Sequence, residues 1–190
     1  MRIRMREMAE DGHVLAGAIT GRKLLARLVE ITGKEPDQPE LVFLDFGGVE
    51  VATASFLRES VLAFRDGVRG RRSNLYPVIA NANEIVADEL KVLVAARGDV
   101  LMLCSLDETG APHEPRLLGE LDPKQRVTFD LVQKLTETDA AQLMREYGER
   151  EKTNFQTVWN NRLNVLAGLG LVMELSEGRA KRYRTLFAEG

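Results

Sequence analysis

Residues 153–172 read TNFQTVWNNRLNVLAGLGLV, and this stretch decides the fold of the last third of the chain. Apolar residues recur at helical spacing through most of it, and Leu169-Gly170-Leu171-Val172 then ends the helix and starts a strand. Thr153 and Gln156 form a capping-box pattern, so we expect the helix to begin at about Asn154.

The flanking sequence completes a recognisable order of elements. Two amphipathic helices precede this one, at 127–135 and 139–147, and Thr138 is the expected N-cap of the second. Residues 172–186 alternate as two strands around a turn at 176–179. Three helices followed by a β-hairpin predict a winged helix.

The sequence of this segment also resembles a known family. Residues 161–166, Asn-Arg-Leu-Asn-Val-Leu, and then 169–172, Leu-Gly-Leu-Val, resemble the recognition helix and following turn of winged-helix transcription factors. Residues 138–143 resemble their positioning helix, and the Gly178 turn with its basic return strand resembles their wing. The resemblance covers 124–187 and implies double-stranded DNA as partner, although some winged helices bind proteins instead.

The expected third helix has two contrasting sides. A helical wheel places an apolar set on the core side: Phe155, Val158, Trp159, Leu166 and Leu169. Arg162 falls towards that side and is expected to pair structurally. The opposite side carries a polar set: Gln156, Thr157, Asn160, Asn161 and Asn164. Amides suit adenine edges in the major groove, so this side is our candidate base-reading face, and a solvated surface is the alternative.

Phosphate contacts are expected from basic residues around this helix. Lys152 precedes it, and the hairpin supplies Arg179, Lys181 and Arg182, together with Arg184. The alternative is a hairpin whose charges serve only solubility. Tight binding to DNA needs more phosphate contacts than these few basic residues can make in a monomer. A homodimer is therefore expected.

The first two thirds of the chain predict an α/β domain over residues 1–121, followed by the winged helix over 122–190. Expected strands at 41–46, 74–80 and 99–104 alternate with helices at 20–31, 53–68 and 85–96. We expect Thr20 to cap the first helix, Pro77 to lie near a bend or a sheet edge, and Ile3 and Met5 to lie in an edge strand. Residues 1–122 carry 15 basic and 20 acidic side chains, and residues 123–190 carry 11 and 9. The more basic tail is consistent with an anionic partner.

A second resemblance lies in this domain. Residues 44–49, Leu-Asp-Phe-Gly-Gly-Val, followed by Thr-Ala-Ser-Phe-Leu at 53–57, resemble the STAS fold of anti-anti-sigma factors, and more closely STAS-like domains of unknown function. Asp45, Gly48, Val49 and Leu57 match, while the family's Asp-Ser-Ser-Gly becomes Thr53-Ala54-Ser55-Phe56. The resemblance implies a kinase-like ATPase or another regulatory protein as partner, with Ser55 at the phosphorylated position.

Phosphate on Ser55, or on Thr53, would add about -1.5 to -2 charges beside a helix N-terminus and remodel a docking surface. The alternative is that these hydroxyls only cap the helix. This motif motivates a second hypothesis besides the DNA-binding regulator, a phosphorylation-controlled interaction module whose winged helix docks protein.

Composition excludes several other classes. The net charge is -3, with 44% hydrophobic and 29% charged residues, as in ordinary globular proteins. Cys104, expected in the core, is the lone cysteine, and His13 and His113 are the lone histidines, so no metal site or cofactor is expected. No apolar run reaches the ~18–20 residues of a membrane span, and the basic N-terminus does not read as a signal peptide. A cytoplasmic protein that is not an enzyme is expected, because no catalytic constellation is evident.

Overall fold

The computed structural model describes residues 1–8, 12–177 and 180–187. The chain divides into two compact units, an N-terminal unit (Met1–Glu120) and a C-terminal unit (Leu121–Gly190), which are described separately. This division falls one residue before the boundary expected from the sequence.

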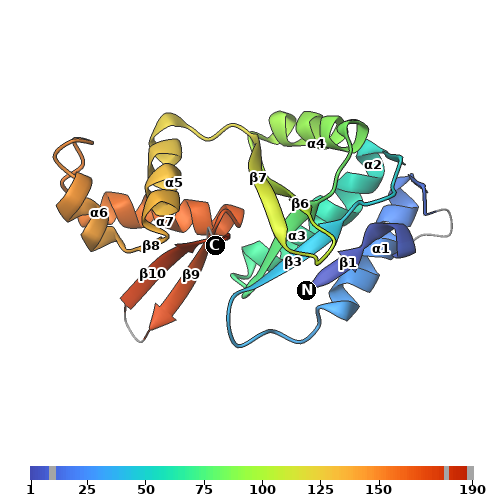
Figure 1. Ribbon diagram of the computed structural model, residues 1–190, viewed down its shortest axis with the longest axis horizontal. Helices are drawn as coiled ribbons and strands as arrows, with labels where there is room; N and C mark the ends of the chain where they lie inside the picture. Colours follow the sequence, from blue (N-terminus) through green and yellow to red (C-terminus); the bar gives the residue numbers. More distant parts are fainter. Residues whose placement is uncertain (9–11, 178–179, 188–190) are drawn as a thin grey trace. The chain divides into compact units, whose positions relative to one another are not determined.

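The N-terminal unit contains a five-stranded mixed sheet in the order β1-β3-β5-β6-β7 (Figure 1). The first four strands are parallel and the last is antiparallel to β6, which confirms the predicted α/β class. The strands are β1 (Arg2–Arg4), β3 (Glu40–Asp45), β5 (Leu75–Ala80), β6 (Val100–Leu106) and β7 (Pro112–Gly119). A separate parallel pair joins β2 (Val14–Leu15) to β4 (Val51–Ala52).

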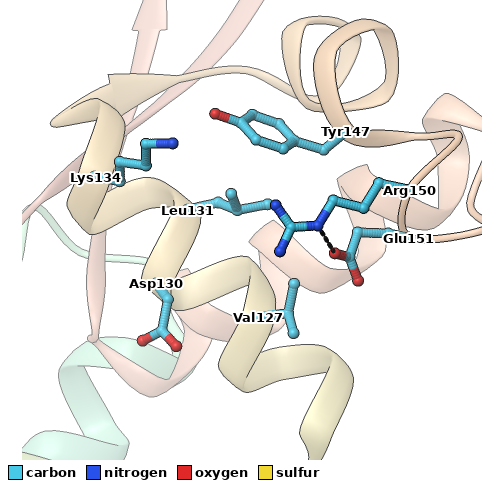
Figure 2. A pocket seen from close by; sticks show the side chains of 7 residues that line it. All are labelled: Val127, Asp130, Leu131, Lys134, Tyr147, Arg150 and Glu151. Carbon is cyan, nitrogen blue, oxygen red and sulfur yellow. Dashed lines mark ion pairs between the residues drawn. The ribbon is translucent and has the colours of Figure 1, made fainter.

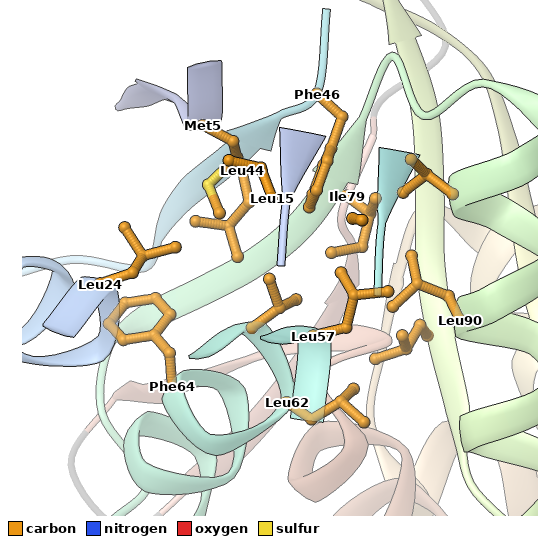
Figure 3. Packing of buried hydrophobic residues seen from close by; sticks show 14 of the residues in the cluster. Met5, Leu15, Leu24, Leu44, Phe46, Leu57, Leu62, Phe64, Ile79 and Leu90 are labelled. Carbon is orange, nitrogen blue, oxygen red and sulfur yellow. The ribbon is translucent and has the colours of Figure 1, made fainter. Parts of the chain in front are cut away.

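Helices connect the parallel strands and pack on one face of the sheet. They are α1 (Ala18–Ile31), α2 (Ala54–Leu57), α3 (Ala63–Gly70) and α4 (Glu84–Arg97). A π-helical turn (Arg58–Leu62) joins α2 to α3, so residues 54–70 form one continuous helical run. A short 3-10 helix, Met5–Met8, follows β1. The core joins these helices to alternate residues of the strands, such as Leu44 and Ile79 (Figure 3).

Three expectations for this unit are wrong. Met5, expected in the edge strand with Ile3, is the first residue of the 3-10 helix, because β1 ends at Arg4. Helix α1 begins at Ala18, two residues before Thr20, because Gly17 at φ 84 makes the turn into the helix. Pro77 lies in β5, which is an inner strand between β3 and β6. The backbone N–H and C=O groups of odd-numbered residues in β5 point towards β6. The two strands pair only at Ile79 and Ala80, so the N–H that Pro77 lacks would have had no partner in β6.

Within its described residues, the C-terminal unit has three helices and a three-stranded sheet in the order β8-β10-β9. The helices are α5 (Pro123–Leu135), α6 (Ala140–Tyr147) and α7 (Gln156–Leu169). The strands are β8 (Glu137–Thr138), β9 (Val172–Glu177) and β10 (Ala180–Thr185). The predicted order of three helices followed by two antiparallel strands is therefore present.

Two expected caps in this unit are also wrong. Thr138 pairs with Tyr183 in the sheet, and the next residue, Asp139, caps α6 by accepting a hydrogen bond from Gln142 N at 2.8 Å. Thr153 does not cap α7, which begins at Gln156 rather than near Asn154. Both threonines have other partners: Thr138 pairs in the sheet, and Thr153 Oγ1 donates to Glu151 O and accepts from Arg162.

Candidate nucleic-acid interface

Helix α7 is anchored by a buried apolar side and by the loop that precedes it. Trp159, Leu163 and Leu166 are fully buried, and the Trp159 Nε1–H donates to Thr153 O at 2.9 Å. Arg162 lies 4.9 Å from the Trp159 ring centroid and donates from Nη2 to Thr153 Oγ1 at 3.2 Å. The structural role expected for Arg162 is confirmed. These contacts set the rotation of the helix, and therefore which residues face solvent.

The predicted base-reading residues separate into two groups. Gln156, Thr157 and Asn161 are exposed, whereas Asn160 and Asn164 are half-buried. Asn164 also has a structural partner, because Tyr183 Oη donates to Asn164 Oδ1 at 3.0 Å. This bond ties α7 to β10. The Asn161 side chain makes no hydrogen bond within the described part of the chain, so its amide is available to a partner.

Apolar side chains share the exposed face. Phe155 is 74% exposed, Val158 37% and Val165 47%. The expectation that Phe155 and Val158 lie in the core is wrong. Phe155 precedes the first turn, and Val158 is about 100° around the helix from Trp159, outside the arc centred on the buried residues. Val165 belongs to neither of the two predicted sets, although the helical wheel places it beside Asn161.

The exposed face of α7 carries no charge. The helix contains no aspartate or glutamate, and its single charged residue, Arg162, is buried. Surface helices are normally rich in glutamate, lysine and arginine. The neutral face is therefore a departure that local helix stability does not explain.

Two of the side chains predicted to contact phosphate already form ion pairs. Lys181 Nζ lies 2.6 Å from Glu174 Oε1, and Arg182 Nε lies 2.5 Å from Glu137 Oε1. Surface ion pairs of this kind contribute only about 0–1 kcal/mol, so a phosphate can replace the carboxylate. Lys152 is exposed in the loop before α7, and Arg179 lies outside the described residues.

A groove of about 330 Å³ lies between α5 and the segment that ends α6 (Figure 2). Its charged side chains already have partners. Lys134 lies over the Tyr147 ring at 5.8 Å, Arg150 pairs with Glu151 at 3.7 Å, and Asp130 pairs with Arg126. None of the residues that line this groove was predicted from the sequence to contact DNA. Its acidic side chains and Arg150 form ion pairs, and Lys134 lies over an aromatic ring.

Thr53 and Ser55 lie where β4 leads into α2. Thr53 is the N-cap, and its Oγ1 accepts from Phe56 N at 3.4 Å and from Gly17 N at 3.2 Å. Ser55 Oγ is 3.3 Å from Thr53 Oγ1, and both side chains are half-buried. The capping role of Thr53 is thus present, whereas Ser55 donates to no backbone acceptor in the described part of the chain.

Asp45, at the end of β3, belongs to a network of hydrogen bonds. Its buried carboxylate accepts from Arg2 Nε at 2.8 Å, Gly47 N at 2.9 Å and Asn81 Nδ2 at 2.7 Å. Asn81 Oδ1 in turn accepts from Leu106 N at 2.8 Å. Burial acts to raise the pKa of Asp45, but these hydrogen bonds and the charge of Arg2 lower it below the usual value. The network joins the ends of β1, β3, β5 and β6.

The remaining chemical groups of the N-terminal unit also have structural explanations. A hollow of about 550 Å³ beside β1 is lined by three arginines, of which Arg2 pairs with Asp45 and Arg4 pairs with Glu7. Cys104 is buried as expected, and burial, followed by the charge of Asp45, raises the pKa of its thiol to about 11. Among the described residues, no three His, Cys, Asp or Glu side chains are grouped to hold a metal ion.

No protein-family model and no curated protein matches this chain. Within the described residues, no helix has both the length and the apolarity needed to cross a membrane.

Proposed function

We propose that this protein is a DNA-binding regulator whose helix α7 enters the major groove of double-stranded DNA. The main observation in support is that the exposed face of α7 is uncharged. A carboxylate placed in the groove would be repelled by the phosphates on either side, and a neutral face avoids that cost. The amides and the hydroxyl on the face suit base edges.

Four basic residues close to α7 in the sequence suit contacts to the DNA backbone. Lys152, Arg179, Lys181 and Arg182 would position the domain on phosphates without reading sequence. Because they are few, we expect a homodimer to supply a second set of contacts. The proposal places the protein in the cytoplasm, as a binding protein rather than an enzyme.

The N-terminal unit would receive the signal. Its resemblance to STAS-like domains supports a regulatory protein, such as a kinase-like ATPase, as its partner. In this arrangement the N-terminal unit docks the partner or senses the signal, and the C-terminal unit binds DNA.

The test is selection from a random duplex library by the purified full chain, at two salt concentrations. We expect an enriched motif whose affinity falls as salt rises. Asn161→Glu should abolish enrichment, because it places a carboxylate on the neutral face. The matched control, Gln38→Glu, makes the same charge change at an exposed amide in the N-terminal unit. Equal loss in both variants, or enrichment that survives Asn161→Glu, would contradict the use of α7.

A second candidate is a phosphorylation-controlled interaction module, and the exposed apolar side chains of the C-terminal unit favour it. Phe155, Val158 and Val165 are all exposed, and apolar side chains gathered on a surface mark protein-contact sites. Ser55→Asp should then abolish capture of the regulatory partner, while Ser55→Ala retains it. Equal capture by both variants, measured by pull-down with the isolated partner, would rule out the switch.

A further inference from the structure

Three exposed side chains form a stripe along α7. Val158, Asn161 and Val165 are spaced by three and then four residues, so they lie above one another on one face of the helix. At 1.5 Å per residue the stripe extends over about 10 Å, which is about three base-pair steps of 3.4 Å. One winged helix in the major groove could therefore place all three against neighbouring base pairs.

The two valines favour one kind of base pair. Valine can neither donate nor accept a hydrogen bond. In the major groove the thymine C5-methyl group is the apolar feature, whereas a G·C pair presents guanine N7 and O6 and cytosine N4–H₂. A valine packed on those polar edges would remove their water without replacing its hydrogen bonds.

Asn161 favours the same kind of base pair. An asparagine amide pairs with adenine through two hydrogen bonds, to N7 and from N6. The exposed Asn161 side chain makes no hydrogen bond within the residues that the structure describes, whereas Asn164 Oδ1 accepts a hydrogen bond from Tyr183 Oη. Asn161 is therefore better placed than Asn164 for this role.

We propose that α7 selects A·T base pairs, with Asn161 on an adenine and with Val158 and Val165 on thymine methyl groups. The inference rests on the proposed function, because it names the base composition that the same face would read. It assigns specificity to two valines that sequence reasoning did not place on this face.

The experiment combines changed bases with changed side chains. After selection with the full chain, each thymine of the core motif is replaced by uracil, which lacks the C5-methyl group, and each adenine by 7-deaza-adenine, which lacks N7. Affinities are measured by fluorescence anisotropy for the unsubstituted protein and for Val158→Ala, Val165→Ala and Asn161→Ala. Val92→Ala, an exposed valine on α4, is the matched control.

We expect uracil at the contacted positions to weaken binding about fourfold per methyl group, on the scale of one buried methylene. That effect should disappear in the corresponding valine variant and persist in Val92→Ala. Asn161→Ala should weaken binding about 5- to 150-fold and remove the sensitivity to 7-deaza-adenine. The loss of both effects together is what distinguishes direct contact from a change in DNA shape.

The outcomes separate this inference from the proposed function. A motif that is G·C-rich at its core, or a uracil effect that is equal in all variants, would overturn the A·T assignment and leave DNA binding intact. No enriched motif, with Trp159 emission showing the C-terminal unit folded, would overturn the proposed function and the inference with it.

Discussion

At the residue scale, two helical glycines in the N-terminal unit show opposite constraints. A Cβ on Gly21, in α1, would lie 2.7 Å from Phe56 O and 3.0 Å from Glu59 Cβ. A Cβ on Gly67, in α3, would meet nothing within 4 Å. Gly21 therefore permits close packing of α1 on the helical run that starts at α2, whereas Gly67 contributes only flexibility.

Gly21→Ala and Gly67→Ala should change stability in opposite directions. The first should lower the free energy of unfolding by about 1–3 kcal/mol through overpacking against backbone. The second should raise it by about 0.5–1 kcal/mol, because alanine loses less entropy in a helix. Urea unfolding followed by circular dichroism measures both. A stabilising Gly21→Ala would show that α1 can move away from Phe56 at little cost.

At the scale of elements, the Asp45 network adds side-chain hydrogen bonds to the backbone pairing of four neighbouring strands. Arg2 reaches it from β1, Asn81 follows β5, and Leu106 ends β6. Asn81 adopts φ 53, a left-handed conformation that asparagine tolerates better than most residues. The network depends on the ionised carboxylate, because its two oxygens accept three hydrogen bonds and form an ion pair with Arg2.

Acid should therefore weaken the N-terminal unit through Asp45. Its pKa is lowered in the folded state, so its contribution is complete above the unfolded pKa of about 3.9 and is lost as pH falls through the folded pKa. We expect the free energy of unfolding to fall less steeply below pH 4 in Asp45→Asn than in the unsubstituted protein. Asp37→Asn, at an exposed carboxylate, is the control. Identical pH profiles for all three proteins would show that the network contributes nothing through its charge.

At the scale of the whole molecule, each unit has a core of its own. The main cluster of buried apolar residues lies entirely within the N-terminal unit. The C-terminal unit buries a separate set around α7: Phe129, Val132, Leu143, Trp159, Leu163, Leu166, Tyr183 and Leu186. A unit of this size with its own buried aromatic residues is large enough to fold alone.

A fragment of residues 121–190 should therefore fold. Trp159 is the single tryptophan and is fully buried, so the fragment should show the blue-shifted emission of a buried indole and a cooperative urea transition. Under the proposed function it should also keep the salt-dependent affinity for the selected duplex, reduced if dimerisation requires the N-terminal unit. Emission typical of solvent-exposed tryptophan would show that the C-terminal unit needs the rest of the chain.

Local patterns in the sequence determined the mixed sheet, the order of helices and strands, and helix ends such as Gly98 and Gly170, where a left-handed residue is required. These features depend on periodicity and backbone preference within a few residues. They are therefore visible before any long-range contact is known.

Only the tertiary structure decided which residues of α7 face solvent and which caps form. Phe155 and Val158 are exposed because the Trp159–Arg162–Thr153 contacts set the start and rotation of the helix, and Asn164 is engaged by Tyr183, 19 residues later. Pro77 lies inside the sheet because strand order is set by pairing between distant segments. The physical reason is common to all of them: each depends on specific side-chain or strand contacts with residues outside the element concerned, which the periodicity of that element does not specify.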